Sequence, residues 1–246
     1  MREVYSFRGC TWALTVLALL VASHARAAGV GLRWDACLAD GGVINKSFAC
    51  NTNTGAIFLV GSFVVDQPLA GLRRVDVSLE LASASPTLPA WWDMVSCRPP
   101  SVGGGSATVA CIPYPGTMGI SGFVIGEHGP NTERIEIGNS SGPPASVTAG
   151  PEYRVVTLRL NLLRTVGTGS CGGCDTPVCI VVRSVSLTQT LGQPPVLVMN
   201  QPLNGTDANY VAWQGGGSPV VGGVVGCPAA TAARRSVWGA LKALYR

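Results

Sequence analysis

The stretch "YRVVTLRLNLL" (residues 153–163) alternates apolar and polar side chains with a period of two. One set of alternate positions is aliphatic: Val156, Leu158, Leu160 and Leu162. The positions between them are polar: Thr157, Arg159 and Asn161. Because successive side chains of a strand point to opposite faces, the pattern predicts a half-buried β-strand whose aliphatic face lies in the core.

Other stretches repeat this design. "RVDVSLELA" (residues 74–82) places Val75, Val77, Leu79 and Leu81 on one face. "AIFLVGSFVV" (residues 56–65) is apolar on both faces, which predicts a central strand, and Gly61 marks a bulge. Shorter strands are predicted at 134–137, 180–189 and 195–200. The stretches "DGG" (40–42), "VGGGS" (102–106), "NSSGPP" (139–144) and "GQPP" (192–195) predict turns between strands.

Composition favours one large β domain. Hydrophobic residues make up 47% of the chain and charged residues only 12%, so a sizeable core is expected and disorder is not. The 32 glycines and 17 prolines suit many turns. The sequence therefore predicts an all-β fold, an antiparallel β-sandwich of the jelly-roll type with long disulfide-bonded loops, over residues 28–227.

The N-terminal residues have the layout of a secretory signal. Arg2 and Arg8 precede an apolar run from Trp12 to Ala22, and an A-x-A cleavage pattern follows at 25–27. The run is too short to span a bilayer as a helix, which disfavours the alternative of an uncleaved anchor. We therefore predict a signal peptide over residues 1–27 and a secreted, extracytoplasmic mature protein.

An even number of cysteines remains after the predicted signal, and an even number in an exported chain predicts disulfides. The eight are Cys37, Cys50, Cys97, Cys111, Cys171, Cys174, Cys179 and Cys227. Short loops favour the pairs Cys37–Cys50 and Cys97–Cys111. Cys227 would then reach back to the cluster at 171–179.

That cluster, in "TGSCGGCDTPVCIVV" (residues 168–182), admits three chemistries. A thioredoxin-type C-x-x-C needs a helix after it, but Pro177 and a β-branched run follow here. Zinc would need four thiolate or imidazole ligands, and an oxidising compartment disfavours free thiolates. We predict structural disulfides.

Aromatic residues supply the predicted binding site. "SPTLPAWWDM" (residues 85–94) carries Trp91 and Trp92, and Tyr114 lies in the next loop. Exposed aromatic rings stack on sugars and peptides, so these three are the predicted binding residues. The alternative is that both tryptophans cap an open end of the sandwich beside Cys97.

Catalytic prospects are poor. The predicted mature chain has one histidine, His128, beside Glu127 in a stretch that reads as a solvated loop, and Glu133 and Glu136 are expected to face solvent. Asp35 and Asp40 give only a weak calcium pattern. We predict no cofactor, no metal and no enzyme activity, with a hydrolase using Glu127 and His128 as the alternative.

Charge excludes nucleic acid as a partner. The chain has 17 basic and 13 acidic residues, and four of the basic ones, Arg234, Arg235, Lys242 and Arg246, lie in the last thirteen positions. The body is close to neutral and has no basic stripe to displace counterions.

The C-terminal segment, "RRSVWGALKALYR" (residues 234–246), predicts a short amphipathic helix after a small-residue linker at 228–233. Its predicted docking face is apolar: Val237, Trp238, Leu241, Leu244 and Tyr245. Because so short a helix needs a partner surface, it docks either on its own domain or on a sorting machinery.

Three sets of motifs carry a resemblance: W-D-x-C at 34–37 with F-A-C-N-T-N at 48–53, C-G-G-C-x-x-P-V-C at 171–179, and W-G-x-x-K-x-L-Y-R at 238–246. Together they resemble a group of uncharacterised exported bacterial proteins over most of the mature chain. The strand series more loosely resembles cohesin-like and carbohydrate-binding sandwiches. The disulfide-bonded fold and the poor catalytic inventory predict a secreted, non-catalytic binding or structural module contacting a glycan, a protein or a cell surface. A surface-attachment or export substrate whose tail is the signal is a further alternative.

Overall fold

The computed structural model describes residues 28–83, 85–99, 102–104, 111–115, 120–190, 197–199, 201–203, 208–215, 218–220 and 224–226. Only the backbone is described at 120–123, 127, 128, 197–199, 218–220 and 224–226. The predicted signal peptide, linker and tail helix lie outside these residues. In the part of the chain so described, no helix has the length and apolar character needed to cross a membrane.

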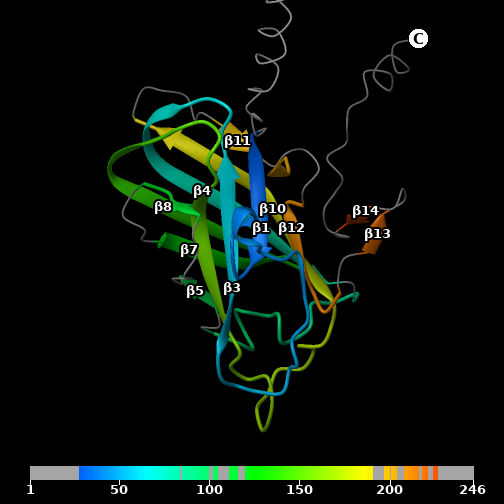
Figure 1. Ribbon diagram of the computed structural model, residues 1–246. Helices are drawn as coiled ribbons and strands as arrows, with labels where there is room; N and C mark the ends of the chain where they lie inside the picture. Colours follow the sequence, from blue (N-terminus) through cyan, green and yellow to red (C-terminus); the bar gives the residue numbers. More distant parts are fainter. Residues whose placement is uncertain are drawn as a thin grey trace, which may run out of the picture.

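Two sheets face each other and form the predicted β-sandwich (Figure 1). The smaller sheet has the order β1-β3-β9-β5, and β6 also pairs with β9. Its strands are β1 (Gly29–Trp34), β3 (Ala56–Val64), β5 (Val102–Gly104), β6 (Ile112–Pro113) and β9 (Tyr153–Asn161). The alternating stretch at 153–163 thus contains β9, which pairs with β3, β5 and β6 in this sheet.

The larger sheet has the order β2-β12-β10-β4-β8-β7, and β11 also pairs with β10. Its strands are β2 (Asn45–Lys46), β4 (Leu69–Ser83), β7 (Ile120–Gly129), β8 (Thr132–Val147), β10 (Val178–Gln189), β11 (Leu197–Met199) and β12 (Tyr210–Trp213). The long strands pair antiparallel, and the short pairs β2–β12 and β6–β9 are parallel. A separate ribbon joins β13 (Ser218–Val220) to β14 (Val224–Gly226), and one 3₁₀ turn, η1, spans Leu38–Asp40.

The core lies between the sheets and is built by the alternation in the sequence. The predicted inward residues of β4 and β9 are buried: Val75, Val77, Leu79, Leu81, Val156, Leu158 and Leu160. The central position of β3 is confirmed, because β1 and β9 flank it. Its register shifts between Gly61 and Ser62, as a bulge requires, and a Cβ on Gly61 would lie 2.6 Å from the Val156 side chain.

The turn predicted at 139–144 is wrong. Strand β8 runs through "NSSGPP" without a break and pairs with β4 on both sides of it. Two register shifts in the β4–β8 pairing, between Leu69 and Arg74, absorb the Gly-Pro-Pro sequence. Because proline removes one donor only, a bulged pairing tolerates it inside a strand.

Candidate binding site at the disulfide-bonded end

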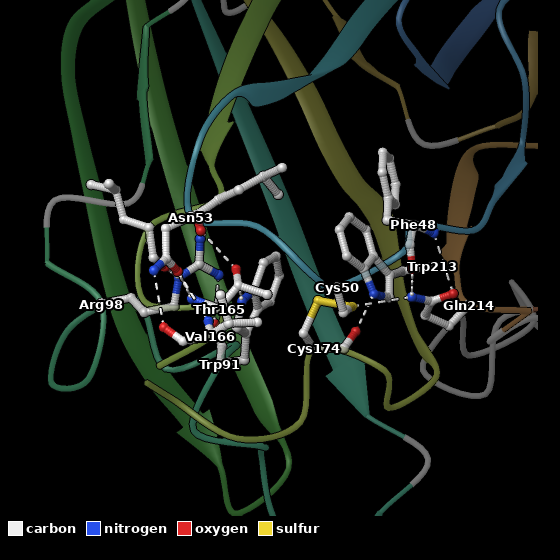
Figure 2. The surroundings of a disulfide bond; sticks show 12 residues. Phe48, Cys50, Asn53, Trp91, Arg98, Thr165, Val166, Cys174, Trp213 and Gln214 are labelled. Atoms are coloured by element: carbon white, nitrogen blue, oxygen red, sulfur yellow. Dashed lines mark hydrogen bonds between the residues drawn. A yellow bond between two sulfur atoms is a disulfide. The ribbon is translucent and has the colours of Figure 1, made fainter. Parts of the chain in front are cut away.

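Five aromatic side chains form a cluster where β1 and β12 end: the buried Trp34, Trp91, Trp92 and Trp213, and the half-buried Phe48. Trp213 is at its centre, with its ring stacked on Phe48 at 4.1 Å and its centroid 5.0 Å from Trp91 and 5.1 Å from Trp92. The indole N–H of Trp213 donates to the Cys174 carbonyl at 2.5 Å (Figure 2). The cluster therefore ties the end of β12 to the cysteine-rich loop.

The predicted aromatic binding surface is not on the outside of the molecule. Trp91, Trp92 and Tyr114 are all buried, and burial raises the pKa of the Tyr114 hydroxyl. A buried ring presents no face to a ligand, so these residues are part of the core in this structure. The alternative, in which the two tryptophans cap an end of the sandwich, describes their position.

Three disulfides are present among the described residues, with pairings that differ from both short-loop predictions. Cys37 bonds Cys111, Cys50 bonds Cys174, and Cys97 bonds Cys171. The predicted pairs Cys37–Cys50 and Cys97–Cys111 are therefore wrong. The observed disulfides join cysteines 74 to 124 residues apart, in loops that the two sheets bring together. Cys179 is also disulfide-bonded, and its partner lies outside the described residues. The predicted return of Cys227 to the cluster lies outside them too.

The structural interpretation of the C-G-G-C cluster is confirmed, because its cysteines bond separate partners rather than each other. Gly173 between them has φ +93°, and a Cβ there would lie 2.5 Å from Pro89. The neighbouring Gly172 carbonyl accepts from the Trp91 amide at 2.8 Å. Gly173 thus lets the cysteine loop lie against the segment that carries Trp91.

Arg98 is a buried charge at this end, with 2% of its surface exposed. Its guanidinium lies 3.6 Å over the Trp91 ring and donates to the carbonyls of Leu163 at 3.1 Å, Trp91 at 2.7 Å and Asn161. Burial lowers the pKa of Arg98 to about 10, so the group stays charged at neutral pH. The three carbonyl acceptors and the Trp91 ring that this charge contacts are all neutral groups.

The loop after β9 is held from two sides (Figure 2). The Asn53 amide accepts from the backbone N–H groups of Thr165 at 2.8 Å and Val166 at 3.0 Å, and donates to the Val166 carbonyl at 2.9 Å. The indole N–H of Trp91 donates to the Thr165 hydroxyl at 2.9 Å. These bonds replace the sheet pairing that β9 loses at Asn161 and fix the loop's conformation.

A cleft of about 310 Å³ opens between this loop and the Cys97 segment. Its lining has two arginines and no acidic residue: Asn53, Arg98, Pro99, Leu163, Arg164, Val166 and Thr168. Arg98 and Arg164 give the cleft positive charge, Pro99, Leu163 and Val166 give it apolar surface, and Arg98 lies against the buried Trp91 ring. Nothing in the composition indicated it, although the C-R-P-P and L-R-T sequences supply its two charges.

A second hollow, of about 290 Å³, lies on the outer face of the larger sheet. Its lining comes from β4, β7 and β8: Arg74, Asp76, Val124, Glu136, Ile137, Gly138 and Ser140. Arg74 pairs with Asp76, and the Ser78 hydroxyl donates to Glu136 at 2.8 Å. The charges of this hollow are therefore matched within the sheet.

The predicted catalytic candidates are placed differently from expectation. Glu127 and His128 lie in strand β7, not in a loop, and their side chains lie outside the described residues. Glu133 is 1% exposed, so the prediction that it faces solvent is wrong, whereas Glu136 is half-exposed. Pairing in β8 explains the difference, because Glu133 shares the inward face with Ile135 and Ile137.

The calcium candidates are engaged in the fold. Asp35 pairs with Lys46, and Asp40 accepts from the Cys111 amide at 2.8 Å. Asp40 also lies beside Cys37 and Cys111, but those two sulfurs are bonded to each other and are not thiolate ligands.

No family model matches the sequence, and no curated protein shows significant similarity to it. Among solved structures, the chain aligns with the sixth cohesin of scaffoldin B from Acetivibrio cellulolyticus, solved in complex with a mutated Cel5 dockerin. The alignment has 10% identity, covers 75% of this chain and 97% of the cohesin, and gives a TM-score of 0.30. That score gives no basis for transferring a function.

Proposed function

We propose that the protein is an exported, non-catalytic binding module that contacts a glycan, a protein or a cell-surface component through the loops at the disulfide-bonded end of its sandwich. The observation that carries the proposal is the cleft between the Cys97 segment and the loop at 161–168. Loops that carry binding residues on a rigid sandwich are a common arrangement in β proteins.

Rigidity supports this assignment. Cys97–Cys171 and Cys50–Cys174 cross-link the segments around the cleft, and Asn53 fixes the loop backbone. A preformed site loses little conformational entropy when a ligand binds, so affinity is gained without ordering the loops. The disulfides also favour an oxidising, extracytoplasmic compartment.

Binding to a glycan array and to isolated cell-surface fractions tests the proposal. Leu163 is 48% exposed in the cleft wall, so Leu163→Asp changes the surface without emptying the core. Val124 is 68% exposed in β7 and lines the other hollow, so Val124→Asp is the matched control. We expect the wild type and Val124→Asp to bind and Leu163→Asp to lose binding.

Either of two results would contradict the proposal. The wild type binds no glycan and no surface fraction, or Leu163→Asp and Val124→Asp bind equally well. Unchanged melting temperatures in both variants establish that the comparison reports the surface rather than the fold.

The two alternative functions depend on side chains that lie outside the described part of the structure. The hydrolase would use Glu127 and His128, and the export or attachment signal would be the tail at 234–246. Both stay predictions from the sequence. Loss of surface retention on deletion of 234–246, with binding unchanged, would support the second.

A further inference from the structure

We propose that the cleft at 161–168 binds the carboxylate of an acidic saccharide, with Arg164 as the contacting cation and Arg98 as a buried charge beneath it. This inference rests on the proposed function and names its ligand class. It begins from the two positive charges in the cleft and from what surrounds them.

Neither arginine is neutralised. Arg98 donates to three carbonyl groups, and Arg164 donates to the Cys97 carbonyl at 2.7 Å. Among the described residues, no ion pair includes Arg98 or Arg164. The nearest acid along the chain, Asp93, accepts instead from the amides of Val95 and Ser96.

Burial strengthens the effect of this charge. Coulomb interactions gain in strength as the surrounding dielectric falls, and Arg98 is almost wholly removed from water. An anion in the cleft would relieve the cost of burying an unpaired cation. A guanidinium has five N–H donors, and among the described residues Arg98 donates three hydrogen bonds, all to carbonyl groups.

Arg164 is held in place before any ligand arrives. Its backbone has φ +58°, its side chain is tied to Cys97, and its carbonyl accepts from the Cys171 amide at 2.8 Å. The Cys97–Cys171 disulfide joins both of these anchors. Arg98 could serve the fold alone, because its hydrogen bonds hold the loop carbonyls in place. That structural role does not explain why Arg164, which is exposed, also lies in the cleft.

The cleft suits a saccharide better than a peptide strand. A peptide that adds to a sheet needs a row of free backbone groups, but here Asn53 and Arg98 occupy the groups of Leu163, Thr165 and Val166. What remains is side-chain chemistry. Leu163, Pro99 and Val166 offer apolar contact, and Thr168 offers a hydroxyl.

Size and charge geometry agree with this class. About 310 Å³ is at the lower end of ligand clefts, roughly 300–1,000 Å³, so one acidic sugar unit is the expected occupant. Arginine recognises carboxylates through two parallel hydrogen bonds, which gives selectivity over neutral sugars. The buried aromatic cluster offers no stacking platform, so charge is the main means of recognition.

Titration calorimetry of the full mature chain with glucuronic acid oligosaccharides, and with neutral glucose oligosaccharides, tests the inference. We expect binding of the acidic series alone, and a loss of at least about tenfold in affinity in Arg164→Ala. Arg159→Ala is the matched control, because Arg159 is an exposed arginine of β9 that does not line the cleft. It should change affinity by less than about twofold.

Three results would overturn the inference. Equal losses in Arg164→Ala and Arg159→Ala would mean nonspecific charge attraction, and equal binding of an oligoglutamate peptide would remove the saccharide assignment. Binding of neutral glycans that Leu163→Asp abolishes and Arg164→Ala spares would reject the acidic ligand while the proposed function stands. Absence of binding to any glycan or surface fraction would reject both.

Discussion

Arginine is used in opposite ways in two regions of this molecule. On the outer face of the larger sheet, Arg74 pairs with Asp76, and Arg134 and Arg183 both pair with Glu80. At the disulfide-bonded end, the hydrogen bonds that Arg98 and Arg164 make within the described part of the chain go to neutral carbonyls. Charges matched within the protein stabilise it, whereas unmatched ones at a cleft are available to a ligand.

The two regions also differ in what holds them. Strand β4 pairs with β8 on one side and with β10 on the other along most of its length, so its side chains add to an already rigid frame. The loops at the other end have few such pairings, and disulfides and side-chain bonds replace them. Disulfides should therefore contribute most to the stability of the loops that lack backbone pairing between strands.

The largest effect is expected from removing Cys97–Cys171. In the chain-entropy description, a disulfide closing a loop of this length contributes about 4 kcal/mol, so Cys97→Ser with Cys171→Ser should lower the free energy of unfolding by about that amount. Denaturant titration measures the change.

The disulfide Cys37–Cys111 is a matched control. Cys37–Cys111 has the same sequence separation, 74, so its double serine variant should lose a similar free energy of unfolding. Only the Cys97–Cys171 variant should also weaken ligand binding, because Arg164 depends on both anchors. Equal binding losses in the two double variants would show that the cleft has no special dependence on its own disulfide.

Much of the fold was predictable, because strand alternation is a local property. The inward faces of 74–82 and 153–163, and the bulge at Gly61, follow from side-chain period and residue size, whereas Thr157 and Glu80 of the predicted outward faces are buried. The oxidised state of the cysteines followed from compartment and number, and it is confirmed for the seven that the structure describes.

The candidate site was not predictable, because it depends on contacts between residues far apart in the sequence. Disulfide pairing depends on which loops the two sheets bring together, so loop length favoured Cys37–Cys50 although Cys37 bonds Cys111. The adjacent Trp91 and Trp92 suggested exposure, but an irregular segment lets both rings pack on Trp213. Burial of Arg98 leaves no mark in the sequence, because its partners are backbone carbonyls.

A smaller effect is expected at Glu80. Burial alone would raise its pKa, but hydrogen bonds and charges from Arg183 and Arg134 outweigh burial and lower the pKa below the ordinary 4.5. The unfolded chain therefore takes up the proton first, and the stabilisation is present above about pH 4.5 and lost as pH falls through the lowered pKa. Glu80→Gln should cost about 2 kcal/mol at pH 7.

The measurement is a series of denaturation curves from pH 7 to pH 3 on the wild type and Glu80→Gln. The gap between them should narrow as the pH falls. Glu136→Gln is the control, because that carboxylate is half-exposed and 3.8 Å from Arg134. A gap that stays constant with pH would show that Glu80 contributes through packing and not through its charge.

The smallest effect is expected from the exposed pair of Arg74 and Asp76. The Asp76 hydrogen bond and charge raise the pKa of Arg74, yet half of each side chain is in water. Exposed pairs contribute about 0–1 kcal/mol, so Arg74→Ala should lower the free energy of unfolding by no more than that, and added salt should remove the difference. Ligand binding should not change, because the pair lines the sheet hollow and not the cleft. A loss of affinity in Arg74→Ala larger than that in Arg164→Ala would move the binding site to the face where the charges are already matched, and the contrast between the two regions would fail.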